Sequence, residues 1–424
     1  MTTTGPTWLP GPTGPQGLDA DRRLALEREL DEVVGRIRQV KGLEGFLLPP
    51  PLSELLPAAE GGPVCIVNVS TWRCDALVVT TGGVEVVPLP GLDVDEADRR
   101  ARDYLGRVAT VARAGALLRD GAVDDEIEGV RAGSEAALDA TLAWLWDVVA
   151  EPVLHALGHD APVPDGGPWS RVWWCPTGPL ALLPLHAAGH HGHESGATVL
   201  DRVVSSYTPT LRALVEARRR PPAPGDDRLL VVSLPEVDGH ARLLHVERER
   251  ADIVKRFADR HTPVNGPEAT PARVADELAR HRYVHLCCHG QQDLDDPSSG
   301  GLVLHGGMLT IAELGSRRHD GEMAFLSACK TAAGGLRLPD EAITLASALH
   351  YTGFRHVVGT LWSVGDEDAA DVAADVYEHL TAGTAKGSVD ASRAAFALHH
   401  AVHRLRDAHP DLPSLWTPFV HVGP

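Results

Sequence analysis

The sequence has few cysteines and no long apolar run. Six cysteines in 424 residues are too sparse for a disulfide framework, so reduced thiols are expected. No apolar stretch approaches the roughly 18 to 20 residues that a membrane-spanning helix needs. Residues 1–16 also lack the basic and apolar regions of a signal peptide. The sequence therefore predicts a cytoplasmic protein that has no membrane partner.

Positive charge is scarce as well. Lys and Arg number 39 against 58 Asp and Glu, which gives a net charge of −19. Such a charge repels a phosphate backbone unless the basic side chains are gathered into one stripe, so we expect no direct nucleic-acid partner. Hydrophobic residues, in contrast, make up 43% of the chain and are ample for a large core. At about 150 residues per domain, the length predicts two or three domain-sized units.

Composition divides the chain into five segments. Residues 1–17 carry four Pro and four Gly, which is typical of a disordered leader. In residues 18–60, apolar side chains recur at three- and four-residue steps over 19–40 and predict an amphipathic helix. A first α/β half is predicted at 61–217, a Pro-rich linker at 218–227 and a second α/β half at 228–424.

Strands alternate with helices after the predicted linker. We expect strands at 229–233, 283–288, 302–304, 323–327 and 355–359, and helices at 246–258, 271–281, 310–316, 340–351, 366–381 and 388–406. This alternation predicts a mostly parallel sheet covered on both faces. Upstream, we expect strands at 64–69, 76–80, 84–87, 171–175, 176–185 and 203–207, and long helices at 94–119 and 125–157.

Two predicted strand ends carry side chains suited to chemistry. Open α/β sheets bind ligands at the carboxyl ends of their strands. One such end reads YVHLCCHG and finishes with His289-Gly290, and the other reads AFLSACKT and contains Cys329. An imidazole can take the proton of a thiol and later pass it to a leaving group, so these two residues could form a thiol-nucleophile site. Taken alone, these residue types are a weak signal, because buried cysteines and hydrogen-bonded core histidines are common.

The segments VHLCCHG, FLSACKT, PDEAITLASAL and GFRHVVGTLWSVGD, in this order and spacing, resemble the CHAT peptidases, caspase-fold cysteine proteases related to separase. The resemblance is specific over 225–424. It is looser upstream, where GPVCIVNVSTWRCDAL, VWWCPTGPLALLPLHAAG and SSYTPTL are similar to the non-catalytic first half of such proteins. It implies a three-layer α/β/α caspase-like fold, with an inactive pseudo-caspase-like half at 61–217 and a catalytic half at 228–424.

The resemblance also implies roles for individual residues. His289 is expected to be the general base and Cys329 the nucleophile, and the backbone N–H groups of Gly290 and Cys329 are expected to bind the oxyanion. A glycine after the histidine allows close approach of the backbone to the scissile carbonyl. Two N–H donors at the developing negative charge supply a large part of catalysis. No metal and no organic cofactor is expected.

Five residues are candidates for the substrate pocket: Asp340, Glu341, Trp362, Asp366 and Asp368. The stretch LWSVGDED, which holds Asp366 and Asp368, resembles the separase segment that helps to recognise a basic side chain. The alternative is that these acids cap a helix and compensate its dipole. Trp362 fits a core anchor as well as a pocket wall. The net negative charge modestly favours cationic peptides.

Metal binding is the main alternative use of the histidines. His285, Cys287 and His289 alternate along one predicted strand and would point to one face, as ligands of a Cys/His metal site would. We favour His285 as a buried, hydrogen-bonded residue that supports the site, because the resemblance includes a histidine at this place. The HHGHESG loop at 190–196 is a second alternative, although its composition is more typical of a solvated loop.

The sequence thus predicts a cysteine endopeptidase that cleaves protein substrates. The resemblance suggests a regulated bacterial protease in defence or cell-death signalling, switched on by an activating partner or a repeat domain, since CHAT domains often follow helical repeats. One rival hypothesis is a catalytically silent caspase-like scaffold that binds peptides. Another is a thiol-dependent hydrolase or transferase that acts on small amides.

Overall fold

The computed structural model describes residues 20–119, 124–192, 196–221, 226–291, 296–327, 344–385 and 387–424. The chain forms two units, which meet in sequence between Leu55 and Leu56. The first unit contains helices α1 (Ala20–Ile37) and α2 (Leu52–Leu55). The helix expected over 19–40 is therefore confirmed, whereas the predicted leader at 1–17 lies outside the described residues.

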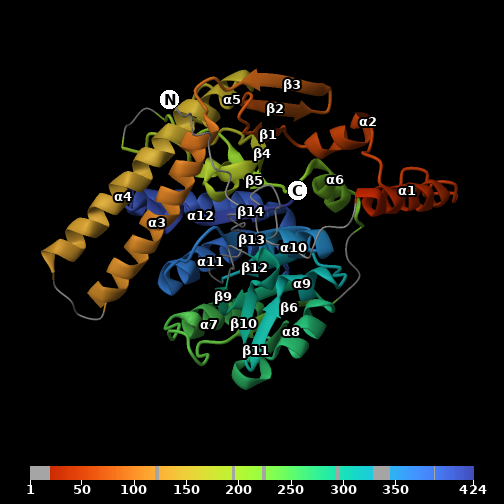
Figure 1. Cartoon of the computed structure of the whole chain (residues 1–424). Helices are drawn as coiled ribbons and strands as arrows, with labels where there is room; N and C mark the ends of the chain where they lie inside the picture. The colour runs from red at the N-terminus through yellow and green to blue at the C-terminus, as the bar shows by residue number, and fades with distance from the viewer. Residues whose placement is uncertain are drawn as a thin grey trace, which may run out of the picture. The chain divides into compact units, whose positions relative to one another are not determined.

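The described part of the second unit is built around one mixed sheet of eleven strands, in the order β3-β2-β1-β4-β5-β14-β13-β12-β8-β6-β7 (Figure 1). The first block contains β1 (Val64–Asn68), β2 (Asp75–Thr80), β3 (Gly83–Pro88), β4 (Arg171–Pro176) and β5 (Val204–Tyr207). The second contains β6 (Asp226–Ser233), β7 (His261–Asn265), β8 (His281–Cys287), β12 (Met323–Leu326), β13 (His356–Thr360) and β14 (Phe419–Val422). One sheet thus runs through both predicted α/β halves.

Strand β14 connects the two blocks of strands within the sheet. It pairs antiparallel with β13 and parallel with β5. Buried polar side chains accompany this pairing: His421 Nδ1 lies 2.8 Å from Ser206 Oγ, and His421 Nε2 lies 3.1 Å from His356 Nδ1. The boundary between the halves stays a prediction, because 222–225 of the expected linker lie outside the described residues and β6 already begins at Asp226.

Helices cover both faces of the sheet, as Figure 1 shows. One face packs against α3 (Val94–Arg119), α4 (Asp125–Leu145), α7 (Val246–Phe257), α11 (Asp366–Thr381) and α12 (Ala394–Ala408). The other packs against α6 (Leu211–Arg219), α8 (Pro271–Leu278), α9 (Ile311–Gly315) and α10 (Leu345–Thr352). Strand β6 serves both cores, because Leu229 and Val231 face one and Leu230 and Val232 face the other. The expected three-layer arrangement is confirmed.

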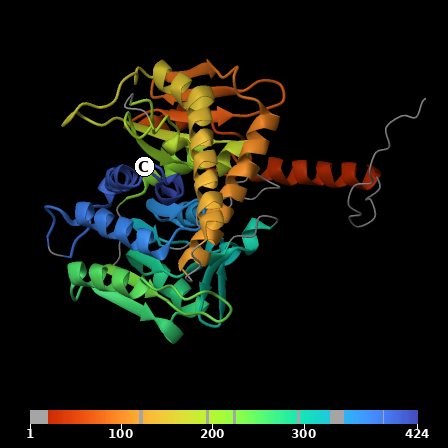
Figure 2. The same cartoon turned by 90° about the vertical axis from the view of Figure 1, so that its left-hand side faces the viewer.

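Helices α3 and α4 lie side by side as a long pair (Figure 2). Helix α4 continues through a π-turn at Trp146–Ala150 into α5 (Glu151–Ala156), so the predicted helix at 125–157 forms one run. Tyr104 of α3 fastens the pair to the second half: its ring lies 5.2 Å from that of Trp362, and its hydroxyl lies 3.2 Å from Thr417 Oγ1. None of the described helices is both long and apolar enough to cross a membrane.

Local structure departs from the sequence prediction where proline interrupts the chain. The strand predicted at 176–185 is wrong, because Gly178–Leu182 and Leu185–Ala187 form 3-10 turns. Prolines at 176, 179 and 184 lack the N–H donors that a strand needs. Strand β7, in contrast, was not expected. It accommodates Pro263 because it forms the edge of the sheet.

A small antiparallel sheet lies beyond the end of β8. It consists of β9 (His289–Gln291), β10 (Gly301–Leu304) and β11 (Gly307–Thr310). His289 therefore belongs to a different sheet from His285. The expectation that both histidines follow one strand is wrong, because the chain leaves the large sheet after Cys287.

Candidate active site

The described residues of the site predicted from the sequence follow strands of the large sheet. Strands β8, β12 and β13 are parallel neighbours, with Leu326 opposite Leu286 and Phe325 opposite Val358. Their carboxyl ends therefore meet at the same edge, where open α/β sheets place ligands. The segments that follow these strands are the ones that carry the predicted residues.

The described residues include part of the predicted site. His289 and Gly290 follow β8, and Trp362, Asp366 and Asp368 follow β13. Cys329, Asp340 and Glu341 lie outside the described residues, which stop at Ser327 after β12 and resume at Thr344. Gly290 lies in β9 opposite Leu302, and its role at the oxyanion stays a prediction.

His289 is anchored through one ring nitrogen. Its Nε2 atom lies 2.8 Å from the carbonyl oxygen of Ala241. A carbonyl can only accept a hydrogen bond, so the imidazole donates from Nε2 and its neutral form keeps the lone pair on Nδ1. Burial lowers the pKa of His289, although the hydrogen bond to Ala241 opposes this shift. His289 is therefore held as a neutral imidazole with Nδ1 as the proton acceptor, which is the form that a general base needs.

His285 is buried behind this edge, with both ring nitrogens hydrogen-bonded. Nε2 lies 3.0 Å from Glu249 Oε1 on α7, and Nδ1 lies 3.1 Å from the hydroxyl of Tyr377 on α11. The imidazole also stacks on Phe325, with ring centroids 5.1 Å apart. The side chain thus joins two helices to the middle of the sheet. Its supporting role for His289 stays a prediction.

The three residues of the alternative metal site do not all come together. Glu249, His285 and Cys287 offer ligand atoms within 4.8 Å of one another, but His289 is not in this group. Burial, together with Glu249, raises the pKa of the Cys287 thiol well above its ordinary value. A metal ligand must be a thiolate, and both nitrogens of His285 already have protein partners. These residues fit a hydrogen-bonded core better than a metal site.

The HHGHESG loop gives no support to the second metal alternative. His190 Nε2 lies 2.8 Å from Asp147 Oδ1, and His191 Nε2 lies 2.7 Å from the carbonyl oxygen of Ala187. Residues 193–195 lie outside the described part of the chain. Within that part, neither of the other two loop histidines belongs to a group of potential metal ligands.

Asp366 is occupied by a contact within the protein. Its Oδ2 accepts a 2.7 Å hydrogen bond from the backbone N–H of His245, and its Oδ1 lies 3.4 Å from His245 Nδ1. Burial pushes the pKa of Asp366 upward, but the bonds from His245 outweigh it and hold the pKa below its usual value. Asp366 therefore connects the start of α11 to the start of α7.

Asp368 and Trp362 line a pocket of about 380 Å³, together with residues of α3 and α4. Burial raises the pKa of Asp368, and the charges of Glu367 and Asp371 add to the shift. A carboxyl group in such surroundings gains from a cationic partner. Trp362 is only 3% exposed and packs on Tyr104, so it serves as a core anchor and as a pocket wall at once.

Four hydrogen-bond partners of these residues were not expected from the sequence: Ala241, His245, Glu249 and Tyr377. The carbonyl of Ala241 carries no sequence signal, because every residue has one. Glu249 did have a signal. It lies three residues after Val246 and four before Ile253, on the buried face of α7, and is itself 3% exposed. An acid on the apolar face of a helix indicates a buried partner.

The fold is similar to that of separase. Two crystal structures of the Saccharomyces cerevisiae separase–securin complex match with 11% identity. One has a TM-score of 0.61 and covers 96% of this chain and 32% of that chain. The other has a TM-score of 0.59 and covers 88% and 31%. This likeness confirms the caspase-like fold, and the chain spans about a third of the length of the separase chains that it matches.

Sequence comparison identifies the family. No curated protein matches the chain significantly. The family model of the CHAT domain matches residues 139–424, well over half of the chain, and this range includes the edge that carries His289, Trp362 and Asp368. The chain therefore belongs to the CHAT domain family and has the caspase-like fold of the separase proteases.

Proposed function

We propose that this chain is a cysteine endopeptidase that cleaves protein substrates, with His289 as the base and Cys329 as the nucleophile. The observation that carries the proposal is the 2.8 Å contact between His289 Nε2 and the Ala241 carbonyl, since it presents Nδ1 as the proton acceptor. The contact lies at the strand edge where open α/β proteins bind ligands. Membership of the CHAT family and the separase-like fold support the same activity.

The other cysteines support Cys329 by elimination. The five described cysteines are all buried and do not form disulfides: Cys65, Cys74, Cys175, Cys287 and Cys288. Burial raises the pKa of Cys65 and Cys175 to about 12. Buried thiols of this kind are inert, because the thiolate is the nucleophile. Cys329 follows β12 by three residues and is the remaining candidate.

The proposed reaction begins when Nδ1 of His289 takes the proton of the Cys329 thiol. The thiolate attacks the scissile carbonyl carbon, and the N–H groups of Gly290 and Cys329 bind the oxyanion that forms. Collapse of this intermediate breaks the C–N bond, and the leaving amine takes the proton from His289. Water, deprotonated by His289, then hydrolyses the thioester and restores the thiol.

Asp368 and Trp362 are the proposed walls of the pocket for the side chain before the cleaved bond. The raised pKa of Asp368 reflects burial beside other acids, and a Lys or Arg of the substrate would relieve this by a charge-assisted hydrogen bond. Asp366 is a weaker candidate, because His245 already occupies its carboxylate. Asp340 and Glu341 stay predicted members of the pocket.

The proposal is tested with the full chain and a peptide-based thiol electrophile, followed by peptide mapping and by cleavage of a denatured protein mixture. We expect labelling of Cys329 and loss of cleavage in Cys329→Ala. His289→Ala should lower turnover by several orders of magnitude. Cys74→Ala is the matched control, because it removes a buried thiol that is far from Cys329 in the sequence. Metal chelators should have no effect.

Retained cleavage by Cys329→Ala would refute the mechanism. Peptide binding with neither labelling nor cleavage would favour the scaffold hypothesis. Cleavage of small amides but not of proteins would favour the thiol-dependent hydrolase.

Regulation is part of the proposal. Separase is bound to securin in the matched structures, and we propose that a protein partner controls this chain as well. The role in bacterial defence or cell-death signalling rests on the resemblance to CHAT peptidases. Expression in a bacterial host tests it: the wild-type chain with its activator should arrest growth, and Cys329→Ala should not.

A further inference from the structure

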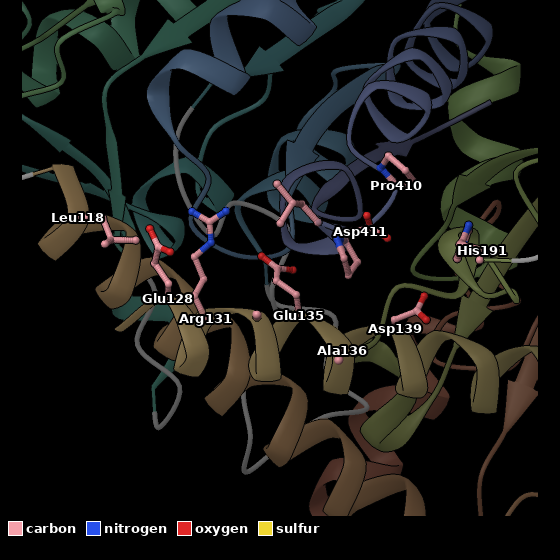
Figure 3. A pocket seen from close by; sticks show the side chains of 13 residues that line it. Leu118, Glu128, Arg131, Glu135, Ala136, Asp139, His191, Pro410 and Asp411 are labelled. Carbon is pink, nitrogen blue, oxygen red and sulfur yellow. The ribbon is translucent and has the colours of Figure 1, made fainter. Parts of the chain in front are cut away.

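A second hollow borders the pocket of Asp368. It has a volume of about 600 Å³ and lies between α4 and the segment 410–413 that follows α12 (Figure 3). The two hollows share Arg131, Glu135 and Leu412 as lining residues. They are therefore neighbouring parts of one depression, which we call the α4 groove.

The wall of this second hollow carries four carboxyl side chains: Glu128, Glu135 and Asp139 from α4, and Asp411 from the opposite side. Figure 3 shows Glu128, Arg131 and Glu135 rising from α4, with Asp411 facing them. The three acids of α4 share one face, since they follow one another at seven and four residues. Among the described lining residues, Arg131 is the one cation at neutral pH, because burial lowers the pKa of His191 to about 4.

The wall of the groove is preformed. Glu135 is buried, and its two carboxylate oxygens accept hydrogen bonds from Ser414, one from the hydroxyl at 2.6 Å and one from the backbone N–H at 3.0 Å. These bonds tie α4 to the chain on the opposite side. Leu118, Ala132 and Pro413 add apolar atoms to the same lining. A surface that combines carboxyl groups with apolar patches suits Lys and Arg, whose long aliphatic stems pack while their charged ends reach an acid.

The length of the groove corresponds to a short stretch of extended peptide. Glu128 and Asp139 are eleven residues apart on α4, which is about 16 Å at 1.5 Å per residue. An extended chain rises about 3.3 Å per residue, so about five residues fit alongside.

We propose that the α4 groove binds an extended basic segment of the substrate, so that recognition includes at least one Lys or Arg beyond the side chain held at Asp368. The substrate role rests on the proposed function, whereas binding itself does not require cleavage. Opposite charges across the contact would mainly set specificity and the rate of association.

The test measures the fluorescence anisotropy of labelled eleven-residue Gly/Ser peptides with the full chain carrying Cys329→Ala. The first peptide has an Arg at its centre and a Lys three and five residues before it. The second has the two Lys at the same distances after the Arg. The third has Gln in place of both Lys. We expect one of the Lys peptides to bind at least tenfold more tightly than the Gln peptide. This difference in affinity should become smaller, by up to about tenfold, when the salt concentration is raised from 50 to 200 mM.

The double variant Glu128→Lys/Asp411→Lys should abolish this preference. Both side chains are exposed, so the variant should fold. The matched control is Glu126→Lys/Asp252→Lys, which changes the net charge equally at exposed positions outside the groove and should keep the preference. Equal binding of the three peptides, or equal loss in the control, would overturn the proposal. Cleavage by the wild-type chain is assayed separately: Lys-dependent binding without cleavage supports the groove and counts against the protease, and cleavage without a Lys preference does the reverse.

Discussion

Glu249 Oε1 lies 3.0 Å from His285 Nε2, and both side chains are buried although they come from α7 and β8. Tyr377 of α11 contacts the other ring nitrogen. Asp366, at the start of α11, holds the backbone of His245 in front of α7. Helices α7 and α11 are thus connected in two places. Asp366 and His245 connect their first residues, and His285 of β8 connects them further along.

Loss of His285 should destabilise the protein. His285→Ala leaves the buried carboxyl group of Glu249 without the imidazole, and we expect the free energy of unfolding to fall by about 3 kcal/mol. Tyr377→Phe removes one hydrogen bond and should cost about 1 kcal/mol. Urea unfolding followed by circular dichroism measures both. A His285→Ala cost no greater than that of Tyr377→Phe would contradict the role given to the Glu249 contact.

The activity should persist at mildly acidic pH. Burial lowers the pKa of His289, so the neutral base survives below the ordinary histidine value of about 6.5. The acid limb of the kcat/KM profile should therefore lie below pH 6.5, as measured with a peptide substrate. The charge of His240 also lowers the pKa of His289, so His240→Gln should move this limb slightly upward. An acid limb above pH 6.5 in the wild type would rule out the described environment of His289.

Substitution of Asp366 and of Asp368 should have different effects on the substrate preference that a peptide library measures. Asp368→Asn should reduce the preference for Lys or Arg before the cleaved bond by about 2 to 5 kcal/mol, because the buried cation loses its partner. Asp366→Asn should leave the preference unchanged and cost about 1 kcal/mol of stability, because its oxygen can still accept from His245. The pocket assignment fails if Asp366→Asn alone changes the profile, or if the wild type prefers aliphatic or acidic residues.

The protein should lose stability as the pH falls below 6.5. Burial lowers the pKa of His186 and His356 to about 3 and of His350 to about 4. Below about pH 6.5, these histidines become protonated in the unfolded chain but stay neutral in the folded chain. The free energy of unfolding therefore falls by about 1.4 kcal/mol per pH unit for each such histidine. Urea unfolding at pH 7, 6 and 5 measures the slope. A flat profile over this range would contradict the burial of these imidazoles.

Much of the fold could be predicted because its signals are local. The apolar run of β6 and the three- and four-residue spacing of α3, α7 and α11 depend only on neighbours in sequence, and the structure confirms these elements. The strand-end position of His289 followed from the same patterns. Strand β14 could not be found in this way, because four residues acquire their structure from pairing with distant strands.

The chemistry of the site depends on contacts between distant segments. The tautomer of His289 is set by the carbonyl of Ala241, which is 48 residues away in sequence. Asp366 and Asp368 differ in role because Asp366 accepts a hydrogen bond from His245, whereas Asp368 lines the pocket beside α3 and α4. No periodicity reports such pairings, since they follow from how the helices pack.

The central place of β14 affects how the chain can be synthesised. Tyr207 of β5 is made more than two hundred residues before its partner Val422. Until β14 emerges, β5 and β13 each present an unpaired edge, and such edges readily associate with other chains. The nascent protein therefore passes through a prolonged aggregation-prone stage, and closure of the sheet is a late, long-range step. Chaperone binding during translation should be concentrated on these two edges.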